Sequence, residues 1–297
     1  GEGSATDWHT IHLGQLALSG AGLMILEATA VSARGRISAQ DLGLYSDANE
    51  AALGRVLDIV RAHSPMALAI QLGHAGRKGS SQRPWEGGKQ IRPDAPFGWL
   101  TEAPSAVPHA ESEAPPMALD HEGLRRVRDD FAQAARRAAR LGFDGIEVHG
   151  AHGYLLHQFL SPIANKRDDE YGGSLENRMR FPLEVFDAVR AAFPAGKPVW
   201  MRISATDWVP GGWDIEGTVA LSRALKARGC AAIHVRSPSS RAARSSYRAA
   251  GIPGLLSAAS SGRITLPSRR RIVRCVRAAT SGSCVTTSIV MPVRWIS

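Results

Sequence analysis

The sequence predicts an α/β protein, a (β/α)8 TIM barrel that is incomplete. Short apolar runs alternate with amphipathic stretches along residues 1–235, which is the pattern of βα units around a parallel sheet. Polar side chains end these apolar runs, and a barrel gathers such strand ends on one face, where active sites form. The side chains in question are Glu27, Gln71, His149 and Arg202.

A doubly wound sheet is the alternative arrangement of such units. Its nucleotide-binding form needs a glycine-rich turn directly after the first strand, whereas Gly20-Ala-Gly22 precedes a strand. The run Gly73–Lys78 has two residues between its glycines where a phosphate-binding loop needs four. Both observations favour the barrel.

Five βα repeats are expected in order. The expected strands are Gly22–Ala28, Met66–Leu72, Gly145–His149, Pro198–Ser204 and Ala231–Val235. The expected helices cover Trp8–Leu18, Asn49–Ala62, His121–Leu141, Leu175–Ala192 and Ile215–Arg228. Five repeats are fewer than the eight of a complete barrel, so we expect the barrel to be incomplete.

A long segment over Ser80–Ala118 interrupts the repeats and holds seven of the 17 prolines. A loop of this length in a compact domain is usually a lid or binding loop at the functional face, or else a disordered insertion. We expect a lid.

The composition excludes several classes of protein. The three cysteines, Cys230, Cys275 and Cys284, form no Cys-x-x-Cys pair, which argues against a disulfide framework and against zinc or iron–sulfur sites. No apolar run of about 18 residues occurs, and no secretory signal is visible at the N-terminus. We therefore expect a cytoplasmic protein.

The net charge of +9 divides the chain into two parts. Residues 236–297 hold eleven Arg and thirteen Ser but no Lys, Asp or Glu, whereas residues 1–235 carry a net charge of −2. We expect an incomplete barrel domain over 1–235 and a disordered Arg/Ser-rich tail over 236–297. An acid-free composition of this kind is typical of translation in a shifted reading frame.

A nucleic-acid-binding tail is the alternative interpretation of this charge. Arginines supply a salt-dependent attraction to phosphates, but only Tyr247 and Trp295 are interleaved as aromatic residues, and no binding motif surrounds Arg269-Arg270-Arg271. We expect nonspecific binding to polyanions and no specific nucleic-acid partner.

The densest candidate site follows the strand Gly145–His149. His149, His152 and Tyr154 lie within six residues of one another, and no third metal ligand follows at ligand spacing, so we expect no metal. Paired imidazole donors suit a substrate oxygen that gains negative charge, and a tyrosine hydroxyl suits a proton donor. This combination predicts reduction of a polarised π bond.

Four runs of residues together resemble the old yellow enzyme family of FMN-dependent NAD(P)H oxidoreductases, in its bacterial NADPH dehydrogenase and xenobiotic reductase subclass. They are Gln71–Lys78, His149–Tyr154, Asn165–Arg178 and Met201–Ser204. The resemblance covers about Gly3–Val235 and implies a barrel with FMN at its carboxyl-end face. It implies contact of Ala28 with the flavin ring, of Gln71 with the pyrimidine part and of Arg202 with N1.

The same resemblance implies the chemistry. His149 and His152 would hold the carbonyl or nitro oxygen of the substrate, Tyr154 would donate a proton to the α-carbon, and Lys78 would lie at the mouth of the site. Hydride would pass from NADPH or NADH through FMN to the β-carbon of an enone or nitroalkene. The natural substrate, the choice of nicotinamide and the oligomeric state, a homo-oligomer in the family, are not predictable from the sequence.

Departures from the family pattern suggest an alternative to an active enzyme. The chain begins after the family's first strand, and the glycine-rich turns that hold the FMN phosphate are not recognisable after Val235. An inactive fragment of the family with a polyanion-binding tail is therefore the competing hypothesis. A larger barrel flavoprotein with an iron–sulfur centre is disfavoured because its cysteine cluster is not recognisable.

Overall fold

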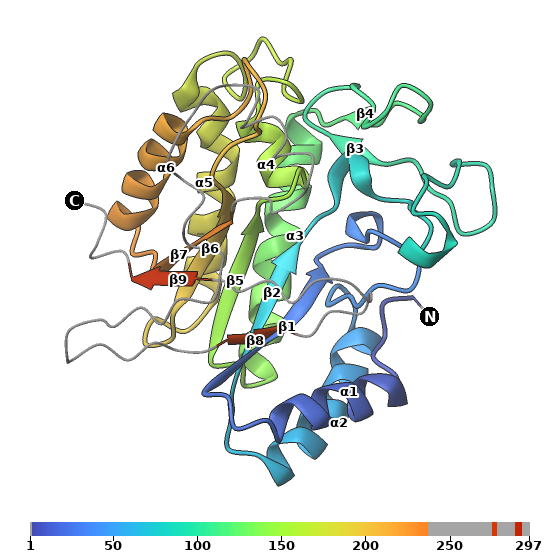
Figure 1. Ribbon diagram of the computed structural model, residues 1–297, viewed down its shortest axis with the longest axis vertical. Coiled ribbons are helices and arrows are strands. Elements are labelled where there is room, and N and C mark those ends of the chain that lie inside the picture. Colours follow the sequence, from blue (N-terminus) through green and yellow to red (C-terminus); the bar gives the residue numbers. More distant parts are fainter. Residues whose placement is uncertain (1, 237–274, 278–288, 293–297) are drawn as a thin grey trace, which may run out of the picture.

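Five parallel strands form the centre of one sheet (Figure 1). A computed structural model describes residues 2–236, 275–277 and 289–292. The central strands, in spatial order, are β1 (Leu23–Ala30), β2 (Ala67–Gly73), β5 (Gly145–Gly150), β6 (Val199–Ser204) and β7 (Ala232–Arg236). The sequence predicts all five of these strands, and each observed end lies within two residues of the predicted one.

Two short strands from the C-terminal part of the chain complete the described sheet. β8 (Cys275–Arg277) lies parallel to β1, and β9 (Ile289–Pro292) lies antiparallel to β7. The described strands form an open series with β8 and β9 at its two edges, and the incompleteness of the barrel stays a prediction. The predicted disorder of 236–297 otherwise concerns residues outside the described ranges.

The helices follow the strands as expected. They are α1 (Asp7–Ala17), α2 (Asp47–His63), α3 (His121–Arg140), α4 (Leu155–Leu160), α5 (Leu175–Ala192) and α6 (Ile215–Ala227). Side-chain caps begin four of them, where Ser46, Asp120, Ser174 and Asp214 accept backbone N–H groups three residues later. The sequence does not predict α4, because all six of its residues are buried and no amphipathic pattern marks it.

The core lies between the sheet and the helices. The apolar side of α3 carries Val127, Phe131 and Ala135, all fully buried, and α3 packs on α5 and β2. Each such aliphatic or aromatic side chain contributes about 1.5–3 kcal/mol on burial. This packing holds the strand ends that carry the candidate site.

One predicted strand-end residue faces away from the others. The register between β1 and β2 shifts between Leu26 and Ala28, so Glu27 is the extra residue of a bulge, and its carboxylate approaches His9 of α1 at 3.8 Å. The expected convergence of Glu27 with Gln71 is therefore wrong. The bulge turns Glu27 toward the helix side and leaves Ala28 opposite Gln71.

The long segment over Ser80–Ala118 is better ordered than the sequence suggests. It contains two-residue strands, β3 (Glu102–Ala103) and β4 (Met117–Ala118), which pair in parallel beyond the carboxyl end of β2 (Figure 1). Arg77 Nη1 donates to the backbone oxygens of Val107 and Pro108 at 3.2 and 3.1 Å. The segment is thus tied to the end of the sheet where a lid would lie, and the lid itself stays a prediction.

Candidate active site

Residues of four neighbouring strands form one row across the sheet. Ala28 lies opposite Gln71, Gln71 lies opposite Glu147, and Glu147 lies opposite Trp200. The side chains of Gln71 and Glu147 are buried and hydrogen-bonded to each other. The structure therefore brings together the two residues, Ala28 and Gln71, that the resemblance assigns to the flavin.

A second row lies two residues further along the strands. His149 of β5 lies opposite Arg202 of β6, and Arg202 lies opposite His234 of β7. Because side chains two residues apart point to the same side of a sheet, this row shares a face with the Gln71 row. All three side chains are buried, with Arg202 entirely excluded from solvent.

The rings of His149, His152 and Tyr154 form one cluster. Ring centroids lie 5.1 Å apart for His149 and His152, 5.0 Å for His149 and Tyr154, and 6.4 Å for His152 and Tyr154. The Ala151 N–H donates to His149 Nδ1 at 3.2 Å, so a neutral His149 carries its proton on Nε2. His149 can therefore donate a hydrogen bond from Nε2.

His152 has a backbone conformation that non-glycine residues rarely adopt. Its φ is +61°, in the left-handed region, and its N–H donates to Ser204 Oγ on β6 at 3.0 Å. Strain of this kind costs about 1–3 kcal/mol and persists where the surroundings enforce it, often at functional sites.

Lys78 lies against the same cluster. Its ammonium donates to the backbone oxygen of His152 at 3.0 Å and lies 4.9 Å from the centre of the Tyr154 ring. Burial, followed by the positive charge of Arg77, lowers the pKa of Lys78 below its ordinary value. The structure thus places Lys78 beside His152 and Tyr154, and its role at the mouth of the site stays a prediction.

Arg202 offers the sharpest test of whether a cofactor fits. Among the described residues, none of its three guanidinium nitrogens has a hydrogen-bond partner. An unpaired buried cation costs several kcal/mol, so the site suits a group that brings acceptors to it. The pyrimidine part of a flavin carries carbonyl and ring-nitrogen acceptors, so Arg202 and Gln71 fit FMN.

A small cavity lies at the same end of the sheet. Its walls include Ala28, Gly73, His149 and Tyr154, and its volume is about 10 Å³. That volume accommodates one water molecule. The fit of FMN therefore rests on the hydrogen-bonding groups of Arg202 and Gln71 rather than on the cavity.

The sequence analysis missed two polar residues at this site. Glu147 and His234 are 1% and 3% exposed, and His234 Nδ1 lies 2.7 Å from Glu147 Oε2. A signal for Glu147 exists, because a carboxylate inside an otherwise apolar strand needs buried partners. The sequence offers no means of naming those partners, since His234 lies 87 residues away.

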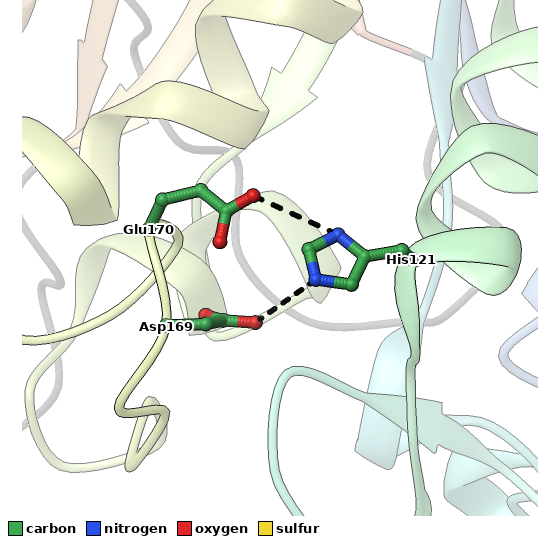
Figure 2. Close-up of side chains that lie close together, drawn as sticks. All are labelled: His121, Asp169 and Glu170. Carbon is green, nitrogen blue, oxygen red and sulfur yellow. Dashed lines mark ion pairs between the residues drawn. The ribbon is translucent and has the colours of Figure 1, made fainter.

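One group of metal-capable side chains occurs among the described residues, and it lies away from this site. His121, Asp169 and Glu170 come together on the surface (Figure 2). Asp169 approaches His121 Nε2 at 3.9 Å, whereas Glu170 approaches Nδ1 at 3.8 Å. His121 and Glu170 are exposed, and exposed acidic groups often come together without an ion, so we assign no metal.

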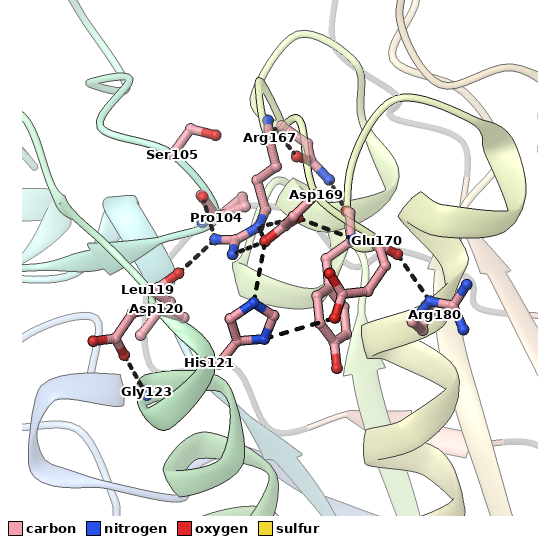
Figure 3. Close-up of polar contacts among 12 residues, drawn as sticks. Pro104, Ser105, Leu119, Asp120, His121, Gly123, Arg167, Asp169, Glu170 and Arg180 are labelled. Carbon is pink, nitrogen blue, oxygen red and sulfur yellow. Dashed lines mark hydrogen bonds and ion pairs between the residues drawn. The ribbon is translucent and has the colours of Figure 1, made fainter.

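The same region braces a loop through Asn165, Arg167 and Asp169. Arg167 binds the Asp169 carboxylate and donates to the backbone oxygens of Pro104 and Leu119 (Figure 3). Asn165 Nδ2 donates to two backbone oxygens on either side of it at 2.8 Å. These contacts tie the segment after α4 to the segment before α3.

Comparison with known proteins decides the family. Residues 1–249 match the sequence model of the NADH:flavin oxidoreductase / NADH oxidase family. The chain belongs to this family. The predicted resemblance to the old yellow enzyme family agrees with that assignment.

Two relatives within the family show how much of it the chain spans. An NADH:flavin oxidoreductase of Gibberella zeae is 43% identical over 249 residues, covering 80% of this chain and 60% of the relative. An NADPH dehydrogenase of Geobacillus sp. strain WCH70 is 41% identical over 236 residues, covering 80% and 64%. The chain spans about three fifths of the length of these curated relatives.

Solved structures give the fold of the family. Morphinone reductase in complex with tetrahydroNAD matches with a TM-score of 0.66 and 33% identity, over 84% of this chain and 70% of that one. The old yellow enzyme homologue from Zymomonas mobilis matches with a TM-score of 0.63 and 28% identity, over 79% and 66%. The predicted TIM-barrel class is confirmed.

No helix in the part of the chain that the structure describes is long and apolar enough to cross a membrane.

Proposed function

We propose that this family member is an FMN-dependent NAD(P)H oxidoreductase of the ene reductase type. The supporting observation is that the His149–His152–Tyr154 cluster lies beside the buried guanidinium of Arg202, which has no hydrogen-bond partner in the described part of the chain. The first offers donors for a substrate oxygen, and the second offers a cation for a flavin. The substrates are α,β-unsaturated carbonyl or nitro compounds.

The chain's own residues divide the work. His149 donates from Nε2 to the carbonyl or nitro oxygen, and His152 acts as its partner, so that negative charge on this oxygen is stabilised as the double bond is reduced. Tyr154 gives its phenolic proton to the α-carbon, while Lys78 beside its ring stabilises the phenolate that remains. FMN, when bound, supplies hydride transfer to the β-carbon. Gln71 and Arg202 hold its pyrimidine side, and Ala28 leaves room beside the ring.

NADPH or NADH is the proposed reductant, and it would use the same site before the alkene does. The support comes from relatives, one named NADPH dehydrogenase and one solved with a reduced NAD analogue. A shared site gives a ping-pong mechanism. The cytoplasmic location and the family-type homo-oligomer stay predictions.

The competing proposal is an inactive chain whose basic tail binds polyanions. Residues 236–297 carry eleven arginines and no acidic residue, a net charge of +11. Binding of this kind weakens steeply with salt. Retention of heparin or RNA that persists at high salt would point instead to a specific nucleic-acid site.

The deciding experiment is a titration of the 297-residue chain with FMN, followed by quenching of flavin fluorescence. Stoichiometric binding that Arg202→Met weakens and Arg136→Met does not supports the proposed cofactor site. Arg136 is the matched control because it lies exposed on α3. An absence of binding to the parent chain refutes the proposed function.

A second experiment tests the substrate class in the flavin-loaded chain. Tyr154→Phe should slow reduction of a cyclic enone at least about tenfold, because the proton donor is lost. Reduction of the bound flavin by NADPH should stay within about twofold of the parent rate. Equal slowing of both half-reactions would contradict the proton-donor role of Tyr154.

A further inference from the structure

Glu147 is the centre of a buried hydrogen-bond network on β5. Gln71 Nε2 of β2 donates to Glu147 Oε1, and Trp200 Nε1 of β6 donates to Oε2 at 2.8 Å. His234 Nδ1 of β7 lies 2.7 Å from Oε2. One carboxylate thus joins three other strands of the sheet, from β2 to β7.

The chemistry of two partners defines the role of the Glu147 oxygens. An indole N–H and an amide NH₂ group can only donate, so Oε1 accepts from Gln71 and Oε2 accepts from Trp200. Both oxygens of Glu147 are therefore held as acceptors on the face of the sheet that carries Arg202.

The same contact fixes the orientation of Gln71. An amide has a donating end and an accepting end of nearly equal shape, so only its hydrogen-bond partners decide which way it points. Glu147 accepts from the nitrogen, which directs the amide oxygen of Gln71 away from Glu147. A leucine or alanine at position 147 would remove that preference.

We infer that Glu147 is the positioning residue that orients the Gln71 amide for the cofactor. The inference rests on the proposed FMN site, where Gln71 contacts the pyrimidine part of the flavin. It goes beyond that site, because Glu147 would affect the cofactor through the orientation of Gln71 rather than by direct contact. A purely structural role for Glu147 would stabilise the sheet without changing FMN affinity.

A double-mutant cycle on FMN affinity separates these roles. Glu147→Gln puts a second amide opposite Gln71 and should weaken FMN binding about tenfold, and Gln71→Leu should weaken it by a similar factor. The double variant should bind no more weakly than Gln71→Leu alone, because Glu147 acts through that residue. Multiplying losses would overturn the inference.

Glu50→Gln is the matched control. Glu50 also accepts from strong donors, at 2.6–2.8 Å from Arg137 and Arg140, but it lies on α2. This variant should leave FMN affinity unchanged within about twofold. Glu147→Asp keeps the charge and withdraws it by one methylene, and it replaces Glu147→Gln in the cycle if that variant does not fold.

Urea unfolding of the FMN-free chain tests the contact by itself. The two substitutions should couple, so that the double variant loses less stability than the two single variants together. Additive losses would overturn the inference even if the chain binds no FMN. Failure of the parent chain to bind FMN would refute the proposed function alone, so the two failures are distinguishable.

Discussion

Two polar networks of similar composition occupy opposite extremes of burial in this protein. In the interior network around Glu147, His234 and the carboxylate are 4% and 1% exposed and lie 2.7 Å apart. In the rim network around Asp169, His121 and Glu170 are 54% and 53% exposed and lie 3.8 Å apart (Figure 3). Histidine and carboxylate are paired in both, so residue type alone does not distinguish a site from a brace.

The difference has a physical cause. Around Glu147 the groups are excluded from water, so each donor must meet an acceptor and the geometry is restricted. Around His121 water competes for the exposed groups and screens the charges, so the contacts of His121 with Asp169 and Glu170 are long and individually weak. Buried networks can therefore orient a ligand-binding amide, whereas exposed networks mainly tie loops together.

The largest expected effect lies at the buried site. In the flavin-loaded chain, replacement of both His149 and His152 by Ala should slow enone reduction about 100- to 1,000-fold, because the donors to the developing oxyanion are lost. Stopped-flow reoxidation of the flavin by a cyclic enone measures this rate. An unchanged rate would contradict the assignment of the histidine pair.

The ion pairs of Glu102 are intermediate in burial between those of the two networks. The carboxylate of Glu102 is fully buried, but its partners Arg34 and Arg126 are half-exposed. Burial by itself raises the pKa of Glu102, but His74 at 3.6 Å and the hydrogen bonds from Arg126 and Arg34 lower it to about 2. At about 1.4 kcal/mol per pKa unit, the shift from 4.5 corresponds to about 3 kcal/mol.

The stabilisation that Glu102 contributes should decrease as the pH falls. Because the folded-state pKa lies below the ordinary value, the stabilisation is present above about pH 4.5 and is lost as the pH falls toward 2. Urea unfolding between pH 7 and pH 2.5 should show a smaller loss for Glu102→Gln than for the parent chain. Glu122→Gln, an exposed control on α3, should lose stability like the parent chain.

Substitution of Arg202 should change FMN binding and the stability of the FMN-free chain in opposite directions. Arg202→Met should weaken FMN binding about tenfold or more, yet raise the melting temperature of the FMN-free chain, because an unpaired buried charge is removed. Fluorescence quenching and thermal melts measure the two effects. A lower melting temperature would mean that Arg202 is already paired within the fold.

The smallest effect is expected for a substitution in the rim network around Asp169. His121→Asn should change the free energy of unfolding by less than about 1 kcal/mol and leave FMN affinity unchanged, because its ion pairs are exposed. Urea unfolding and FMN titration check both values beside Glu147→Gln. A loss of FMN affinity as large as that of Glu147→Gln would remove the distinction between the two networks.

Local patterns made much of the fold and part of the site predictable. Helical and strand periodicity placed the five central strands and the five longer helices, since the pattern depends on backbone geometry within each element. His149, His152 and Tyr154 were predictable as a cluster because a single strand end and the turn after it carry all three. The six-residue helix α4 escaped prediction because it is buried on all sides.

By itself, the sequence determined the βα order, the family resemblance and the charge division at residue 235, because each of these is a property of contiguous residues. Only the tertiary structure decided that Glu147 meets Gln71 across 76 residues of chain, and that a bulge turns Glu27 away from the site. Such contacts depend on the register between strands, and a shift of one residue sends a side chain to the other face of the sheet.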